Sequence, residues 1–248
     1  MIRVLLLLLV AALPARAEEV VAGLSQSRIS ITTNFDGSEL LIFGAVKREA
    51  APPEGPLQVV IAVAGPSTPV TVRRKDRRFG IWVNAETVEV DRAPSFYAVA
   101  TSGEWSDSLL EIEDLRHSIS VPRAIRAVGT GSANPEDFTD ALIRIRREAG
   151  LYQTLIGAVD VEEATLFSTR IGLPANLIEG VYDVRFFLTR NGRVIATGEK
   201  EIGVFKVGLE KFLYALAHQQ PLIYGLLSLA IAVGAGWGAS AAFRYMRS

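Results

Sequence analysis

A dense run of cations is the feature of this sequence with the clearest capacity for chemistry. Five of the residues between positions 73 and 78 are basic: Arg73, Arg74, Lys75, Arg77 and Arg78. Arginine forks match oxyanions, so the run could bind a small anion, lipid head groups or an acidic partner. Trp82 follows, either as an aromatic platform beside these cations or as a core residue. The alternative for the run is a solvated hairpin tip whose charges protect strand edges.

Residues suited to catalysis or metal binding are scarce. The chain has no cysteine and only two histidines, His117 and His218. This excludes thiol catalysis, thiolate metal sites and a multi-histidine site within one chain. Serines at 102–108 with His117 nearby would suit a hydrolase, but the G-x-S-x-G nucleophile elbow is absent. We therefore expect a protein that is not an enzyme and carries no cofactor or metal.

The N-terminus has the pattern of an export signal. An apolar run at 4–13 follows Arg3, and Ala15-x-Ala17 is the small-residue motif of a signal peptidase site. As a helix this run covers about 15 Å, half of a bilayer core, which disfavours an uncleaved anchor. We expect residues 1–17 to be a signal peptide cleaved after Ala17, which makes Glu18 the first residue of the mature chain.

The C-terminus has the pattern of a membrane anchor. Residues 222–243 contain no charge and as a helix would span about 33 Å, enough to cross a bilayer. Pro221 suits the first turn of this helix. Arg244 and Arg247 follow, and positive flanking charge marks the cytoplasmic side. We expect a membrane helix at 221–243, a cytoplasmic tail at 244–248 and a periplasmic N-terminal part, all in a bacterial inner membrane.

Small residues recur every fourth position along the expected membrane helix. They are Ala230, Gly234, Gly238 and Ala242. Such a stripe lets helices approach closely, which predicts self-association or docking on an inner-membrane protein. The alternative is that glycine and alanine are simply common in membrane helices. The helix has no ionisable residue, which argues against a transport path through this chain alone.

The charge of the exported part argues against one class of partner. Without Arg3, Arg16, Arg244 and Arg247, the 26 basic residues fall to 22, against 27 acidic residues. Nucleic-acid binding needs a basic footprint, so no nucleic-acid partner is expected.

The remainder of the chain is mainly β by pattern. Alternating segments predict a β-sandwich domain at 18–103 and a second β region at 151–205, as one fold or two modules. In the first region they include short strands at 70–72, 80–83 and 87–90. In the second, Asn191-Gly192 predicts a tight hairpin, and Tyr182 resembles the strand-entry tyrosine of immunoglobulin-like domains. We expect an immunoglobulin-like β-sandwich with a short inserted helix.

Two helices are expected outside the membrane segment. In the connecting segment 104–150, Asn134 as N-cap and Pro135 predict a helix at 135–149. Its expected apolar face is Phe138, Ala141, Leu142 and Ile145. A juxtamembrane helix is predicted at 206–220, either lying at the membrane surface or continuing into the membrane helix.

Several short motifs spread over nearly the whole chain carry a family resemblance. They are Phe43-Gly44-Ala45, Arg73-Arg74-Lys75 with Gly80-Ile81-Trp82-Val83-Asn84, Pro94-Ser95-Phe96-Tyr97, Gly150-Leu151-Tyr152, Leu173-Pro174-Ala175-Asn176, Gly180-x-Tyr182 and Gly225-Leu226-Leu227. In these the chain resembles a family of alphaproteobacterial transmembrane proteins with a signal peptide and a C-terminal single-pass helix. The resemblance implies no activity, and it suggests an association with exporters of the sulfite or sulfonate type.

These observations predict a non-enzymatic, membrane-anchored periplasmic module. We expect it to be an accessory or interaction protein for an inner-membrane partner. The alternative is a periplasmic module that binds a small anion or ligand through Arg73–Arg78 and Trp82.

Overall fold

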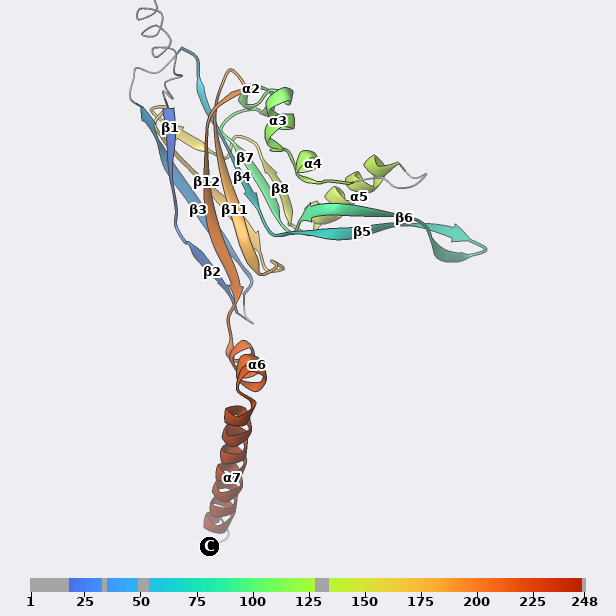
Figure 1. The fold of residues 1–248 in the computed structure, drawn as a ribbon, viewed down its shortest axis with the longest axis vertical. Coiled ribbons are helices and arrows are strands. Elements are labelled where there is room, and N and C mark those ends of the chain that lie inside the picture. Colours follow the sequence, from blue (N-terminus) through green and yellow to red (C-terminus); the bar gives the residue numbers. More distant parts are fainter. Residues whose placement is uncertain (1–17, 33–34, 49–53, 128–133, 247–248) are drawn as a thin grey trace, which may run out of the picture. The chain divides into compact units, whose positions relative to one another are not determined.

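The computed structural model describes residues 18–32, 35–48, 54–127 and 134–246, and the chain is mainly β (Figure 1). The expected signal peptide, including Ala17, and the last two residues of the tail lie outside these ranges. The strands are β1 (Glu18–Leu24), β2 (Arg28–Ile31), β3 (Gly37–Arg48), β4 (Leu57–Ala64), β5 (Ser67–Arg78), β6 (Ile81–Pro94), β7 (Tyr97–Thr101), β8 (Tyr152–Leu155), β9 (Asp160–Glu162), β10 (Leu166–Pro174), β11 (Gly180–Arg190) and β12 (Arg193–Lys206). The helices are α2 (Trp105–Ser108), α3 (Glu111–His117), α4 (Val121–Ala124), α5 (Pro135–Glu148), α6 (Leu209–Gln219) and α7 (Pro221–Met246).

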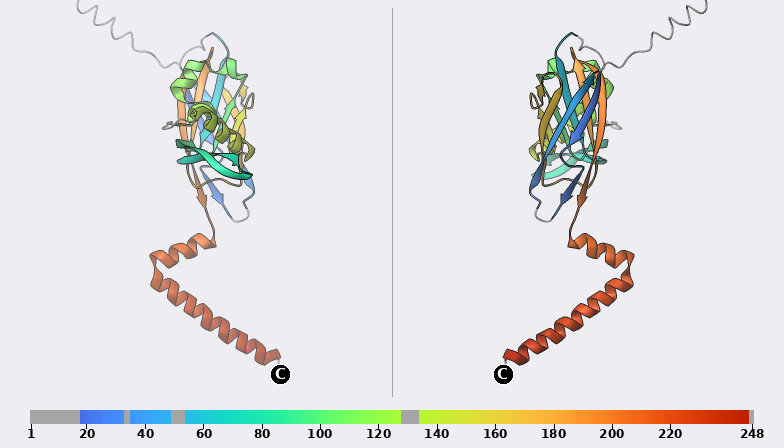
Figure 2. Two further views of the ribbon diagram at one scale, coloured as in Figure 1. Left: turned by 90° about the vertical axis from the view of Figure 1, so that its right-hand side faces the viewer. Right: turned by 90° about the vertical axis from the view of Figure 1, so that its left-hand side faces the viewer.

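Two sheets pack face to face to form the β domain (Figure 2). One has the order β1-β3-β10-β9 and the other β2-β12-β11-β4-β7-β8, in which β7 and β8 are parallel. The ring of Phe167 on β10 lies 6.1 Å from that of Phe186 on β11, which joins the sheets across the core. Gly198 on β12 faces Val20 on β1 so closely that a Cβ added to Gly198 would lie 3.3 Å from the Cβ of Val20.

The two β regions of the sequence share both sheets. In one sheet β3 pairs with β10, with Leu41 opposite Arg170. In the other β4 pairs with β11, with Ile61 opposite Phe186. Strands before residue 104 and after residue 150 therefore interleave, and they form one composite fold.

The β11–β12 hairpin follows the sequence pattern closely. Tyr182, Val184, Phe186 and Leu188 alternate along β11 and are all buried. The turn residues Asn191 and Gly192 have φ of 50° and 73°, as a type I′ turn requires. The hydroxyl of Tyr182 donates a hydrogen bond to the carbonyl of Ile178 at 2.8 Å.

The segment between the β regions covers the outer face of the six-stranded sheet. A second core forms where Val60 and Phe187 of the sheet meet Leu109, Ile119 and Leu142 from the helical segment. Strand β4 is therefore buried on both faces, which explains its unbroken apolar run from Val59 to Ala64.

Helix α5 occupies the predicted segment but buries a different face. The Asn134 side chain accepts a hydrogen bond from the backbone N–H of Glu136 at 3.3 Å, and Pro135 opens the helix. Ile143 is buried and Ile145 is exposed, so the predicted face was wrong at Ile145. The reason is Arg146, which donates to the carbonyl of Ser95 at 2.9 Å and thereby takes a place on the inner side.

Strands were predicted at 70–72, 80–83 and 87–90, and residues 70–72, 81–83 and 87–90 do lie in strands, but their division into three short strands was wrong. They belong to two long strands, β5 and β6, that form a two-stranded ribbon separate from the other sheets (Figure 1). Phe79 and Gly80 make its turn, with φ of 50° and 85°. Because most of the ribbon has no core to cover, its sequence lacks the apolar alternation by which a long strand is recognised.

Helices α6 and α7 form the C-terminal part of the chain. Residues 221–240 of α7 are long and apolar enough to cross a membrane. Gln220, with φ of −138° and ψ of 64°, separates α6 from α7, so the two are distinct helices and not one continuous rod.

Candidate functional site

The end of the β5–β6 ribbon exposes large apolar side chains. Phe79 is fully exposed, and Ile81 and Trp82 are 65% and 67% exposed. Trp82 therefore does not belong to the core. We call residues 73–84 the hairpin tip. Phe79 and Ile81 were not among the predicted site residues, although an apolar Phe-Gly-Ile-Trp run directly after a basic segment was a readable signal.

Strand register places cations beside the apolar residues on both faces of the hairpin tip. Arg77 lies opposite Trp82, and Arg78 lies opposite Ile81. Directly opposed residues of an antiparallel pair project on the same side, so each face carries one apolar residue and one arginine. The predicted site residues are thus brought together on a single ribbon.

Only part of the positive charge at the hairpin tip is balanced. Arg74 pairs with Glu86 at 2.8 Å, and Arg78 lies 3.5 Å from Asp76. Both pairs are exposed, so each contributes little to stability. In the described part of the chain no ion pair involves Arg73, Lys75 or Arg77. The tip is therefore a positively charged, partly apolar surface.

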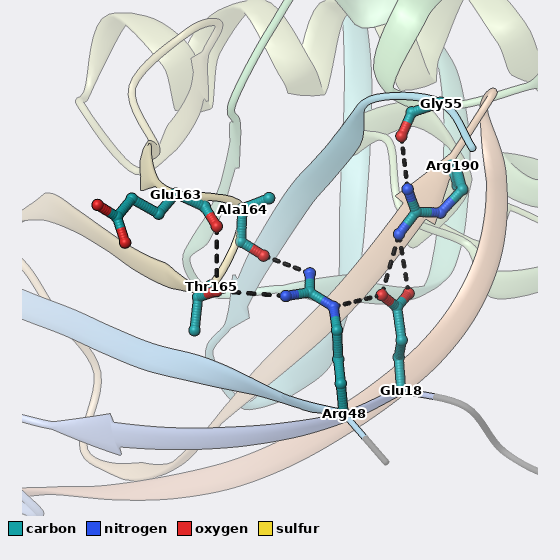
Figure 3. A network of polar contacts seen from close by, with 7 residues as sticks. All are labelled: Glu18, Arg48, Gly55, Glu163, Ala164, Thr165 and Arg190. Atoms are coloured by element: carbon teal, nitrogen blue, oxygen red, sulfur yellow. Dashed lines mark hydrogen bonds and ion pairs between the residues drawn. The ribbon is translucent and has the colours of Figure 1, made fainter. Parts of the chain in front are cut away.

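A second charge cluster is buried where the two sheets meet (Figure 3). Glu18 on β1 accepts from Arg48 Nε at 2.7 Å and from Arg190 Nη2 at 2.9 and 3.2 Å. Arg48 also donates to Thr165 Oγ1 at 3.2 Å, and Arg190 to the carbonyl of Gly55. Sequence reasoning missed this cluster because its members are far apart in the chain.

The electrostatics of Glu18 identify this cluster as structural. Burial alone raises the pKa of its carboxyl, but hydrogen bonds and charge from Arg48 and Arg190 outweigh burial and bring the pKa below its usual value. The carboxylate stays ionised and its oxygens are occupied, so the cluster joins β1, β3 and β11 rather than offering a binding site.

A cleft of about 960 Å³ lies at the root of the hairpin. Four arginines line it: Arg92, Arg123, Arg126 and Arg185. This grouping was not predicted, because the four residues come from three separate segments of the chain and none lies in a motif.

The residues considered for catalysis serve other contacts. The ring of His117 lies 5.5 Å from that of Phe187 at a tilt of 57°, and its Nε2 lies 3.6 Å from a carboxylate oxygen of Glu113. Ser106 is hydrogen-bonded to the neighbouring Asp107 at 3.3 Å. Within the described ranges, no group of three or more His, Cys, Asp or Glu is placed to hold a metal ion.

The small-residue stripe lies along α7. Residues four apart share one side of a helix, so Ala230, Gly234, Gly238 and Ala242 follow one side of it. A Cβ added at Gly234 or Gly238 meets nothing within 4 Å in the described chain. These glycines are therefore not required by packing within the chain itself.

A β domain followed by a helix of membrane-spanning character defines a membrane-anchored β protein. The chain matches, over residues 19–245, the family described as "Putative transmembrane protein (Alph_Pro_TM)", and it belongs to that family. This confirms the resemblance expected from the sequence.

Two further comparisons add little. Among curated proteins nothing matches the chain. Among solved structures, the sporulation control protein Spo0M from Bacillus subtilis is similar at 11% identity with a TM-score of 0.28. The match covers 82% of this chain and 56% of Spo0M, so the chain spans little more than half of that protein's length. A likeness this weak supports neither a fold nor a function.

Proposed function

We propose that this protein is a non-enzymatic, membrane-anchored module that docks on an acidic surface of an inner-membrane protein through its hairpin tip. One observation carries the proposal: Phe79, Ile81 and Trp82 are exposed together among cations at the end of a ribbon. Exposed apolar groups of this kind are typical of interaction sites, because their removal from water on binding a partner lowers the free energy of the complex.

The composition of the hairpin tip favours a protein partner over a lipid surface. Protein interfaces are enriched in aromatic residues and arginine and depleted in lysine. Four of the five cations at the tip are arginines, whose forks pair with carboxylates. Burial of each of the three apolar side chains in a partner pocket is worth about 1.5–3 kcal/mol.

The anchor favours a partner in the same membrane. Tethering two proteins to one bilayer raises their effective concentration, so a modest tip affinity suffices. The export signal at 1–17 and the flanking Arg244 and Arg247 support a periplasmic β domain anchored in the inner membrane. The family resemblance suggests a sulfite or sulfonate exporter as the first partner to test.

An immunoglobulin-like relationship of the β domain is also part of this proposal. It is supported by the face-to-face sheets and by the contact of Tyr182 with Ile178. The parallel pairing of β7 and β8 departs from that fold's antiparallel sheets.

The alternative function, anion binding by Arg73–Arg78, is less favoured. Specific small-ligand sites are concave, whereas these cations lie on an open ribbon.

Site-specific photo-cross-linking tests the docking proposal in the full chain in native membranes. Benzoylphenylalanine replaces Ile81 at the hairpin tip or, as a matched control, the exposed Ile195 on β12. We expect position 81, but not 195, to cross-link to one integral membrane protein. Adducts with lipid alone, or the same adducts from both positions, would contradict the proposal and favour a lipid surface or no specific partner.

A further inference from the structure

The cleft at the root of the hairpin has the properties of a ligand site. Its volume of about 960 Å³ is in the range of small-molecule pockets. Arg92 comes from β6, Arg123 from α4 and Arg185 from β11, and Arg126 follows α4. The carboxylates of Asp183 and Glu199 also line it. Positive charge exceeds negative charge there, although the exported part of the chain is mildly acidic.

Two of these arginines are held opposite one another by the backbone. The N–H of Arg92 donates to the carbonyl of Arg126 at 3.2 Å, and the N–H of Arg126 donates to the carbonyl of Arg92 at 2.9 Å. Directly opposed residues project on the same side, and like charges in this position are destabilising. Neither arginine takes part in an ion pair with any residue that the structure describes. An anion between them would relieve the repulsion.

Neutral hydrogen-bond acceptors hold the side chain of Arg185 in place and do not neutralise its charge. Its guanidinium donates to Tyr97 Oη at 3.1 Å and to the carbonyls of His117 and Ser118 at 2.8 and 3.0 Å. It also lies 5.5 Å from the centre of the Phe187 ring. Burial raises the pKa of Tyr97, so its hydroxyl stays neutral. All three acceptors are uncharged, which leaves a preorganised positive charge at the wall of the cleft.

We propose that this cleft binds a phosphate ester. Arg92 and Arg126 lie directly opposite one another and both line the cleft, and two arginine forks can together bind more of the oxygens of a tetrahedral phosphate group than of a single carboxylate. Leu115 and Ile125 line the same cleft and offer an apolar surface to the organic part of the ligand. This inference does not depend on docking by the hairpin tip, whose residues lie outside the lining.

Thermal unfolding of the full chain in neutral detergent tests the proposal. The probes are glycerol 3-phosphate and inorganic pyrophosphate, compared with sodium chloride at equal ionic strength. A second arm compares nanodiscs that contain phosphatidylglycerol with nanodiscs of phosphatidylcholine. The test variant is Arg92→Gln with Arg126→Gln, and Arg170→Gln on β10, outside the cleft, is the matched control.

We expect the wild type and Arg170→Gln to be stabilised by the probe and the double variant to lose affinity by about tenfold for each arginine removed. Without anion, the double variant should melt no lower than the wild type, because the backbone bridge remains and the repulsion is gone. Stabilisation by glycerol 3-phosphate identifies a soluble ester, and stabilisation only in phosphatidylglycerol nanodiscs identifies a lipid head group. The proposal would be overturned if a probe stabilised the double variant as much as the wild type, or if no probe stabilised the wild type. Arg126→Gln alone provides the same comparison if the double variant fails to fold.

Discussion

The buried cluster around Glu18 allows a prediction whose size follows from the structure. The side chains of Glu18 and Arg190 are 3% and 8% exposed. Replacing Glu18 by alanine removes the carboxylate that Arg48 and the buried Arg190 share. Breaking a buried pair in this way costs about 3–5 kcal/mol of unfolding free energy. Glu19→Ala is the matched control, because Glu19 forms an exposed pair with Lys47 at 3.5 Å and its loss costs less than about 1 kcal/mol.

Chemical denaturation of the full chain in neutral detergent, followed by tryptophan fluorescence, measures the two costs. Mass spectrometry of the mature N-terminus verifies that both variants are processed alike, since both positions follow the expected cleavage site. Equal losses of stability for Glu18→Ala and Glu19→Ala would refute the reasoning. Glu18→Leu with Arg190→Met should recover most of the loss, because a buried pair is often replaceable by apolar residues of similar size.

The same carboxylate predicts a dependence on acid. The pKa of Glu18 is lower in the folded chain than its usual value of 4.5, so the unfolded chain takes up the proton more readily. Ionised Glu18 stabilises the folded chain fully above pH 4.5. This stabilisation is lost as the pH falls below 4.5 and through the lower pKa that Glu18 has in the folded chain. The wild type should therefore lose more stability than Glu18→Ala between pH 5 and the acid limit of the folded state, as measured by denaturation at a series of pH values.

Three other predictions concern different parts of the chain. Burial raises the pKa of Tyr152 to about 12, so at most about 3 kcal/mol of unfolding free energy should be lost as the pH rises from 10 to 12. Tyr152→Phe should lessen this loss in alkaline denaturation. Phe79→Ser with Trp82→Ser should change the unfolding free energy by less than about 1 kcal/mol, because both residues are exposed. Cross-linking to the partner should disappear in the same variant. A large loss of stability would show that the hairpin tip packs on the β domain. Gly234→Leu with Gly238→Leu should leave membrane insertion intact and reduce severalfold the cross-linking between α7 helices through a cysteine introduced into α7. An unchanged yield would contradict association through the stripe.

Local signals in the sequence predicted the elements that depend on neighbouring residues. The buried alternation of β11, the turn at Asn191-Gly192 and the cap at Asn134 are each encoded within a few positions. The apolar helix at the C-terminus is similarly explicit. These features need no knowledge of the tertiary structure.

Features that depend on distant residues could not be predicted in this way. The pairing of Leu41 with Arg170, and the cluster of Glu18 with Arg190, join segments that nothing in the local pattern relates. The buried side of α5 was misjudged because an arginine occupies it through a hydrogen bond to Ser95. The long ribbon was missed because an uncovered strand need not alternate.

Charge reversal at the hairpin tip tests the central claim most directly. The measurement is the yield of the cross-link from position 81 to an integral membrane protein in native membranes. The wild-type chain is compared with Arg73→Glu combined with Arg77→Glu, and Arg170→Glu serves as control. Docking on an acidic partner predicts that the yield falls at least tenfold in the double variant and stays unchanged in the control. A yield that is the same in all three chains would contradict it.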